Sequence, residues 1–227
     1  MKKSDNTTPL PSKEYDSNIY NTIPYYGCFH QETINLIESM DIKPKIWLDT
    51  GCGTGTLVQK AIPHFKSTCF VLSDPSNGML DEARIKLEEY GDKIKILKPK
   101  PTHEIFISMN VDVITAIQSH HYMTKDERIN ATKACYELLN ENGIYVVFEN
   151  ISPLTERGIQ IGKKYWKDFQ ISKGKSEKEA MNHLNRFNVE YFPLNVEEHL
   201  SLLRECGFKI VELFWYSYMQ AGFYCIK

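Results

Sequence analysis

The sequence lacks the marks of membrane and secreted proteins. No apolar run among the 227 residues approaches the roughly 20 residues that a membrane-spanning helix needs. The N-terminal stretch MKKSDNTTPLPSKEYD has no apolar core of a signal peptide. The six cysteines form no CxxC pair, and several lie inside apolar runs, where free thiols commonly pack. We therefore expect a cytoplasmic protein without a membrane partner, whose cysteines are reduced and mostly structural.

The sequence also lacks an excess of charge of either sign. The 27 Lys and Arg residues and 29 Asp and Glu residues leave a formal net charge of -2, and the pI is near 6.4. Because no broad basic field can neutralise phosphates, the composition argues against DNA as a partner. A local basic patch around Lys163, Lys164 and Lys167 leaves tRNA open, although such lysines are usually a solvated helix face.

Short apolar runs alternate with longer amphipathic segments from residue 44 onward. Runs such as KIWLDTG, TCFVLSD and VDVITAIQ are typical of buried strands, and SNGMLDEARIKLEEYG is typical of a helix. This alternation indicates right-handed crossovers and a parallel sheet with helices on both faces. The final runs, FKIVELFWYSY and AGFYCIK, predict an antiparallel hairpin. The predicted fold class is therefore α/β, with a Rossmann-like, seven-stranded mixed sheet whose last strand is antiparallel.

Two parts of the chain depart from this alternation. The first 14 residues are polar, contain two prolines and lack periodicity, so we expect residues 1–14 to be a disordered tail. Residues 153–193 are mainly helical in pattern and interrupt the strand–helix order. We predict a single domain over residues 15–227, with a helical cap at about 153–193.

The stretch LDTGCGTG places glycines at alternate positions directly behind the first predicted strand. A dinucleotide-binding dehydrogenase needs G-x-G-x-x-G, and Thr56 stands where its third glycine would be. The G-K-[ST] ending of a phosphate-binding P-loop is also missing. Asp49 would repel a pyrophosphate but suits a ligand with an ammonium group. Gly51 and Gly53 would let that ligand lie against the backbone.

A second acid follows at the end of the next predicted strand. Asp74 lies at the distance from Gly51 where an acid takes the ribose hydroxyls with its two oxygens. With these two motifs the chain resembles the class I S-adenosylmethionine-dependent methyltransferases, over nearly all of its length from residue 15. Their D-x-S-x-x-M-L stretch is matched by Asp74, Ser76, Met79 and Leu80.

The resemblance implies S-adenosylmethionine (SAM) as cofactor and S-adenosylhomocysteine (SAH) as product. Pro75 would flank the adenine, and Ile117 and Gln118 would touch the cofactor by their backbone. The family usually carries an Asp after the third strand, but this chain reads LKPKPTHEIF, so Thr102 or His103 would take its place. The predicted cofactor-binding residues are Tyr26, Asp49, Gly51, Cys52, Gly53, Gly55, Asp74, Pro75, Met79, Thr102, Ile117 and Gln118.

The loop after the fourth predicted strand, TAIQSHHYMTKDE, should face the methyl group, because ligands of open α/β sheets lie beyond the carboxyl ends of the strands. His120 and His121 are the candidate catalytic residues, as general bases, unless they pack beneath the site. We expect no metal there, since adjacent side chains do not converge on one ion and no Cys or Asp accompanies them at zinc spacing. Glu149 and Asn150 end the fifth strand at the same rim, as substrate contacts or as an ordinary strand end.

The aromatic segment IPYYGCF, a helical insert with an arginine and the GF before the last hairpin resemble one subgroup of the family, which includes the carboxy-S-adenosylmethionine synthases. By that resemblance Tyr26 would approach the cofactor and Arg186 would lie near the transferred group. The Arg186 guanidinium could then fix a carboxylate, with a surface salt bridge as the alternative. The predicted substrate contacts are Glu149, Asn150, Arg186, Tyr191 and Trp215.

The sequence thus predicts a SAM-dependent methyl transfer to a small-molecule acceptor in an enclosed pocket, by a monomer or homodimer. The sulfonium is already activated, so the protein has chiefly to align the acceptor and exclude water, and no triad or carboxylate pair is needed. Three alternatives stay open. They are a tRNA-modification-related enzyme that uses or makes a carboxylated SAM, a non-catalytic SAM-binding module, and a nicotinamide dehydrogenase.

Overall fold

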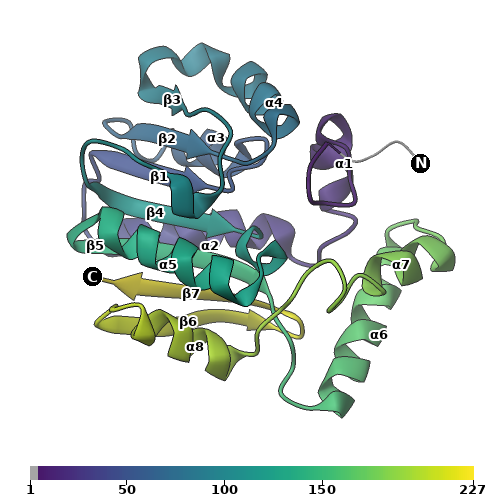
Figure 1. Ribbon diagram of the computed structural model, residues 1–227. Helices are drawn as coiled ribbons and strands as arrows, with labels where there is room; N and C mark the ends of the chain where they lie inside the picture. Colours follow the sequence, from purple (N-terminus) through teal and green to yellow (C-terminus); the bar gives the residue numbers. More distant parts are fainter. Residues whose placement is uncertain (1–4) are drawn as a thin grey trace.

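Seven strands form one sheet, in the order β3-β2-β1-β4-β5-β7-β6, in the computed structural model, which describes residues 5–227. The strands are β1 (Ile46–Thr50), β2 (Cys69–Ser73), β3 (Ile94–Ile96), β4 (Val111–Ile117), β5 (Leu139–Asn150), β6 (Ile210–Ser217) and β7 (Gln220–Ile226). Neighbouring strands are parallel except that β7 is antiparallel to both β5 and β6. The predicted mixed sheet with an antiparallel last strand is therefore confirmed (Figure 1).

Helices cover both faces of this sheet (Figure 1). On one face lie α2 (Tyr26–Ser39), α3 (Thr56–Ala61) and α4 (Asn77–Leu87), and on the other α5 (Lys125–Leu138) and α8 (Val196–Glu205). Trp47 and Leu48 are neighbours in β1, and each is fully buried in a different one of the two cores. Because both faces are covered, the central strands are mostly apolar on both sides rather than alternating.

Three of the helices in residues 5–227 begin with a capping box. In this motif the side chain of the cap residue accepts the N–H of the third helical residue, and the carboxylate of that third residue accepts the N–H of the cap residue. They are α5, α7 (Glu177–Leu184) and α8. The pairs are Thr124 with Glu127, Ser176 with Glu179, and Asn195 with Glu198. These local bonds fix where each helix starts. The sequence indicates them through a Ser, Thr or Asn followed three positions later by Glu.

The segment predicted as a helical cap forms α6 (Glu156–Ser172) and α7. In Figure 1 these helices (green) stand to the right of the sheet, beyond the carboxyl ends of the parallel strands and below α1 (Tyr15–Ile19). The indole Nε1 of Trp166 donates to the carbonyl of Thr22 at 2.6 Å. The insert is therefore tied to the N-terminal segment on the same side of the sheet. No helix within residues 5–227 combines the length and apolarity of a membrane span.

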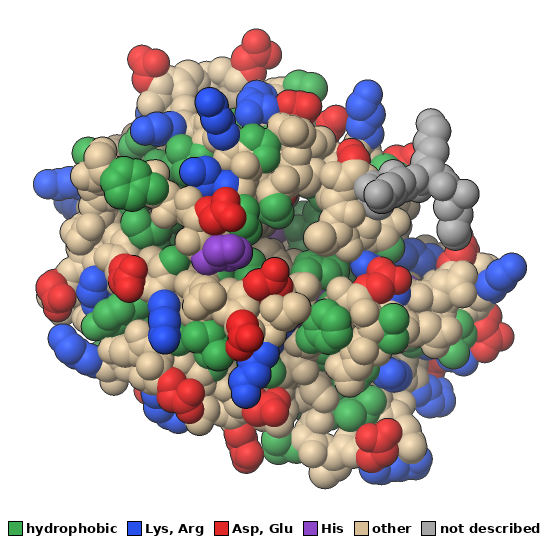
Figure 2. Space-filling view, viewed as in Figure 1, with side chains coloured by type: hydrophobic (Ala, Val, Ile, Leu, Met, Phe, Trp, Pro, Cys, Tyr) green, Lys and Arg blue, Asp and Glu red, His purple; other side chains and the backbone are tan. Residues whose placement is uncertain are grey.

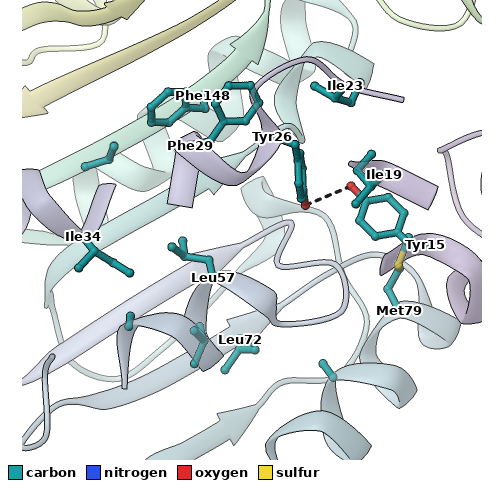
Figure 3. Close-up of a cluster of buried hydrophobic side chains, with 14 of the residues drawn as sticks. Tyr15, Ile19, Ile23, Tyr26, Phe29, Ile34, Leu57, Leu72, Met79 and Phe148 are labelled. Carbon is teal, nitrogen blue, oxygen red and sulfur yellow. Dashed lines mark hydrogen bonds between the residues drawn. The ribbon is translucent and has the colours of Figure 1, made fainter. Parts of the chain in front are cut away.

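The N-terminal segment packs into the main core through a run of aromatic and aliphatic side chains (Figure 3). Phe29 of α2 stacks on Phe148 of β5, with ring centroids 4.9 Å apart. The Tyr15 and Tyr26 hydroxyls lie 3.5 Å apart. This packing sets α1 at the edge where the parallel strands end.

Residues 5–14 differ from the disordered tail that composition predicts. The amide of Asn6 donates to the carbonyl of Leu10 at 3.0 Å and to Ser12 Oγ at 3.2 Å. A 3-10 turn follows at Ser12–Glu14, and Ser12 is buried. Side chain–backbone bonds order the segment, and composition alone does not show such bonds. Residues 1–4 of the predicted tail lie outside the described residues.

Candidate cofactor site

A cavity of about 230 Å³ opens where β1, β2 and β4 end. Its walls come from the loops after these strands and from the N-terminal segment. The predicted cofactor contacts that line it are Gly51, Cys52, Gly53, Asp74, Pro75, Met79, Thr102, Ile117 and Gln118. Lining residues outside that set are Asn6, Thr7, Thr8, Tyr15, Pro101, His103, Ser119, Tyr122, Met123 and Glu127. Most of the predicted set is thus brought to one place.

The glycine turn contacts the cavity through its first two glycines. Gly51 and Gly53 have φ angles of +64° and +53°, in the left-handed region that favours glycine. A Cβ on Gly51 would also lie 2.4 Å from the Cβ of Ser119, in the loop after β4. Gly51 therefore allows two strand-end loops to meet at the floor of the cavity.

Gly55 does not line the cavity, contrary to its predicted role. A Cβ there would lie 2.9 Å from Leu87 Cδ1 and 3.3 Å from Leu72 Cδ2. Gly55 instead lets the start of α3 pack closely against α4 and β2. The alternate spacing of the motif therefore combines two ligand-facing glycines with one packing glycine.

Asp74 joins the two loops that carry the motifs. Its Oδ2 accepts the Gly53 N–H at 3.0 Å, and its Oδ1 accepts the Ser76 N–H at 2.8 Å. Burial raises the pKa of the Asp74 carboxyl, while the bonds from Ser76 and Gly53 oppose the rise. Asp74 lines the cavity, and each carboxylate oxygen can accept a further hydrogen bond, as from a ribose hydroxyl.

Asp49 lies beneath the cavity wall rather than in it. It is 2% exposed, and Thr115 Oγ1 donates to its Oδ1 at 2.6 Å. Burial raises the pKa of Asp49 to about 7, against the hydrogen bond from Thr115. A cationic group brought close to it would favour its ionised form.

Tyr26, predicted to approach the cofactor, is buried in the core and does not line the cavity. Tyr15 lines it instead, with its hydroxyl next to that of Tyr26 (Figure 3). The two tyrosines belong to consecutive helices that pack together, and the sequence does not show which of them faces outward.

Thr102 and His103 both line the cavity after β3. The Thr102 hydroxyl is already engaged, 2.6 Å from Thr50 Oγ1 and 3.2 Å from His120 Nε2. The His103 ring lies 3.9 Å from Glu104 Oε1, in a looser contact than the bonds of Thr102.

His120 and His121 are buried and lie outside the cavity lining. The ring of His120 is held by Thr102 and by the Tyr145 hydroxyl, 3.1 Å from Nδ1. Burial lowers the pKa of His120 to about 4. The His121 ring lies 2.5 Å from Glu149 Oε2 and 3.2 Å from Asn150 Nδ2. With both ring nitrogens of each histidine engaged, the packing alternative describes them better than the general-base prediction.

Glu149 and Asn150 are also buried beneath the site, not at its surface. Glu149 accepts the backbone N–H groups of His120 and His121, at 3.0 and 2.8 Å, as well as the His121 ring. Burial alone would raise the pKa of Glu149, but the charge and hydrogen bond of His121 lower it. Glu149 thus anchors the loop that carries Gln118 and Tyr122, and its contact with a substrate stays a prediction.

The other predicted substrate residues also lie outside the cavity lining. Trp215 packs in the core against Phe29 at 5.3 Å between ring centroids. Tyr191 is buried, and its ring meets that of Tyr122 edge to face at 6.4 Å. Arg186 is close to the site but donates from Nη2 to the Thr7 carbonyl at 2.9 Å.

The cavity lining carries negative rather than positive charge. Among its residues from the described chain are the acids Asp74 and Glu127, and there is no Lys or Arg. Such a lining suits a ligand with sulfonium and ammonium groups and is unfavourable for a pyrophosphate. The residues present therefore fit SAM better than a dinucleotide.

Residues 48–145 match a family described as a methyltransferase domain. The chain is 23% identical over 204 residues to carboxy-S-adenosyl-L-methionine synthase from Campylobacter lari, covering 87% of this chain and 84% of the relative. A solved structure from Nostoc punctiforme, described as a proposed O-methyltransferase, has a TM-score of 0.70 at 12% identity, over 95% of this chain and 60% of that one. PigF, solved with SAH, has a TM-score of 0.63 at 16% identity, over 100% of this chain and 63% of that one.

The family match runs from β1 into β5, the part of the sheet whose ends form the cavity. This strand order and the matched methyltransferase domain support a class I SAM-dependent methyltransferase that uses SAM as its cofactor. Within that class it is related, at low identity, to the carboxy-S-adenosylmethionine synthases.

Proposed function

We propose that the chain transfers the methyl group of SAM to a small-molecule acceptor inside the cavity. The observation that carries this proposal is that the cavity is walled on its outer side. Thr7 and Thr8 of the N-terminal segment and Tyr122 of the loop after β4 line it together with the strand-end loops. A lining that closes in this way favours a small acceptor over a macromolecule.

The cofactor can be laid along the cavity by the chemistry of its walls. Asp74 would take the ribose hydroxyls, and the backbone at Gly51 and Gly53 would lie against the methionine part. Pro75 and His103 would meet the adenine. This arrangement leaves Tyr122, with Gln118, at the part of the wall that would face the acceptor.

The residues around the acceptor would act by alignment rather than by removing a proton. SAM supplies a methyl group on a sulfonium, which is activated before it binds. Burial raises the pKa of Tyr15 and of Tyr122 above the usual range for tyrosine, so both phenols stay neutral at neutral pH. Their hydroxyls can hold an acceptor and exclude water, which is sufficient for an acceptor that is already a nucleophile.

A second candidate is an enzyme that makes or uses a carboxylated SAM. The relatives named above support it, and so does the Arg186 side chain. Its Nη1 is buried and makes no hydrogen bond of good geometry among residues 5–227, and its guanidinium carbon lies 5.9 Å from the ring centre of Tyr122, with whose hydroxyl it interacts. A guanidinium with a spare N–H suits a carboxylate.

The tRNA alternative has less support. The face seen in Figure 2 mixes basic and acidic side chains rather than gathering basic ones. Lys164 and Lys167 of the candidate basic patch are paired with Asp168 and Glu177. A gel shift with tRNA over a salt series tests this point, because phosphate contacts would make binding fall steeply as salt rises.

Turnover is tested by incubating the purified protein with SAM and pools of small acceptors, and measuring SAH by mass spectrometry. A methyltransferase gives SAH in proportion to a methylated product. SAM binding without SAH from any pool would favour a non-catalytic binding module, and a carboxylated cofactor copurifying with the protein would favour the second candidate.

A further inference from the structure

The outer wall of the cavity is made by a segment that composition predicts to be disordered. Asn6, Thr7 and Thr8 line the same cavity as the glycine turn. We refer to residues 5–11 as the strap. In Figure 1 the N-terminal segment (purple) stands between α4 and the cap helices, so it spans the two sides of the site.

One end of the strap is fixed to the loop that carries Asp74, the acid proposed to bind the ribose. Ser76 Oγ donates to the Asp5 carbonyl at 2.8 Å, and the same serine donates its N–H to Asp74. Gly78 lies directly under this contact, because a Cβ added there would lie 2.3 Å from Asp5 Oδ2 and 2.9 Å from Ser12 Oγ. The strap is therefore seated on the first turn of α4, where a methyl group on Gly78 would have to displace the Asp5 carboxylate.

The other side of the strap is fixed to the chain that follows α7. Arg186 Nη2 donates to the Thr7 carbonyl at 2.9 Å, while Arg186 Nε donates to Glu190 at 2.6 Å. The Arg186 side chain is only 9% exposed. A single buried arginine thus joins the strap to the cap region.

Within the strap, side chains bond to its own backbone. Asn6 Oδ1 accepts the Thr8 N–H at 2.8 Å, and the Asn6 amide donates to the Leu10 carbonyl at 3.0 Å. Pro9 and Pro11 restrict the backbone further. These bonds favour movement of the strap as a unit, hinged before the turn at Ser12–Glu14.

From this geometry we propose that residues 5–11 form a lid over the cofactor cavity, with two latches, Ser76 to Asp5 and Arg186 to Thr7. The inference rests on the proposed cofactor site. Opening the lid frees the wall formed by Asn6, Thr7 and Thr8, through which SAM enters and SAH leaves. Within residues 5–227, the two latches hold the lid to the loop of Asp74 and to the cap region, and bonds from the Ser12 N–H to Asp5 and from the Asn6 amide to Ser12 Oγ cross its hinge. None of these bonds involves a strand, so the lid opens without disturbing the sheet.

The release rate of SAH tests the lid in two variants of different kinds. In one, a single methionine replaces all residues before Ser12, so both latches are lost. In the other, Gly78→Ala keeps every polar group but displaces the Asp5 end, and alanine is also a better helix former than glycine at this position. Ile85→Ala, an exposed change on the same helix, is the matched control.

SAH dissociation is measured by stopped-flow competition. Since a hydrogen bond of ordinary strength corresponds to a factor of about five, the truncated chain should release SAH roughly 20-fold faster and Gly78→Ala about fivefold faster. Ile85→Ala should leave the rate unchanged. Rates equal to wild type in both variants, with SAH still bound, would overturn the lid.

Trypsin provides a second measurement that does not depend on a variant. Lys13 is exposed and lies two positions after the strap. SAH bound behind a closed lid should slow cleavage after Lys13, and cleavage at an equal rate with and without saturating SAH would contradict the proposal. If wild type binds no SAH at all, the failure belongs to the proposed function and not to the lid.

Discussion

Replacing Asp74 by alanine tests the cofactor assignment at its most specific point. The carboxylate is 8% exposed and holds two backbone N–H groups, from Gly53 at 3.0 Å and from Ser76 at 2.8 Å. Asp74 lines the cavity and keeps acceptor capacity on both oxygens, to which the two ribose hydroxyls would donate. Alanine removes all of these bonds, whereas asparagine keeps the shape and one acceptor oxygen.

The expected loss follows from the strength of such bonds. A hydrogen bond to a charged group contributes about 1.5 kcal/mol at the low end of its range, so two lost ribose bonds correspond to about 3 kcal/mol and a Kd for SAH roughly 100-fold higher. Asp74→Asn retains one neutral acceptor and should raise the Kd only about tenfold.

Asp112 offers a matched control at the opposite edge of the sheet. Its Oδ2 accepts the N–H groups of Lys45 and Ile46, at 2.7 and 3.1 Å, near the start of β4. Asp112→Ala should therefore lower the free energy of unfolding by about 1 to 3 kcal/mol and leave SAH binding unchanged. Calorimetric titration of SAH into the three variants measures the Kd, and denaturant unfolding measures the stability of Asp112→Ala. An unchanged Kd for Asp74→Ala would refute the ribose assignment.

Three further predictions concern the framework of the site. Gly51→Ala should abolish SAH binding, because its Cβ would lie 2.4 Å from the Cβ of Ser119. Gly53→Ala has open space at its Cβ and should lose only about 1 kcal/mol of stability, the cost of a left-handed backbone for alanine. Equal melting temperatures for the two variants would contradict this difference. Glu149→Gln should lower the free energy of unfolding by about 3 kcal/mol at neutral pH. The difference from wild type should shrink in acid, because a carboxyl with a lowered pKa stabilises the fold only while it is ionised. A difference that does not depend on pH would count against this role of Glu149. Burial lowers the pKa of four histidines, so the folded state holds them neutral. Their contribution to the free energy of unfolding is full above about pH 6.5, the unfolded pKa, and is lost as the pH falls from there toward 4. Denaturant unfolding curves that coincide across this pH range would contradict the prediction. These histidines are His30, His120, His183 and His199.

The sequence was sufficient for the sheet and the cofactor end of the site because these depend on local patterns. Uninterrupted apolar runs mark strands buried on both faces, and the Asn195–Glu198 box marks the start of a helix. Gly51, Gly53 and Asp74 lie at fixed distances behind two strands, and parallel strands bring their ends to one edge. The positions of these residues in the sequence are therefore enough to predict that they meet at one edge of the sheet.

The acceptor side depends on long-range packing, which spacing does not contain. His120 and His121 follow the right strand, yet their rings turn inward because a buried acid, Glu149, accepts their N–H groups. Tyr15 rather than Tyr26 reaches the cavity because of how two short helices pack. The strap is polar in composition but is held by bonds to residues more than 70 positions away, such as Ser76 to Asp5.

The most direct test of the account is native mass spectrometry of the purified protein, first as isolated and then with SAM or NADH added. The account predicts that SAM or SAH binds at one equivalent per chain, that binding weakens in Asp74→Ala and not in Asp112→Ala, and that NADH does not bind. Binding of NADH by a chain that takes up neither SAM nor SAH would contradict it.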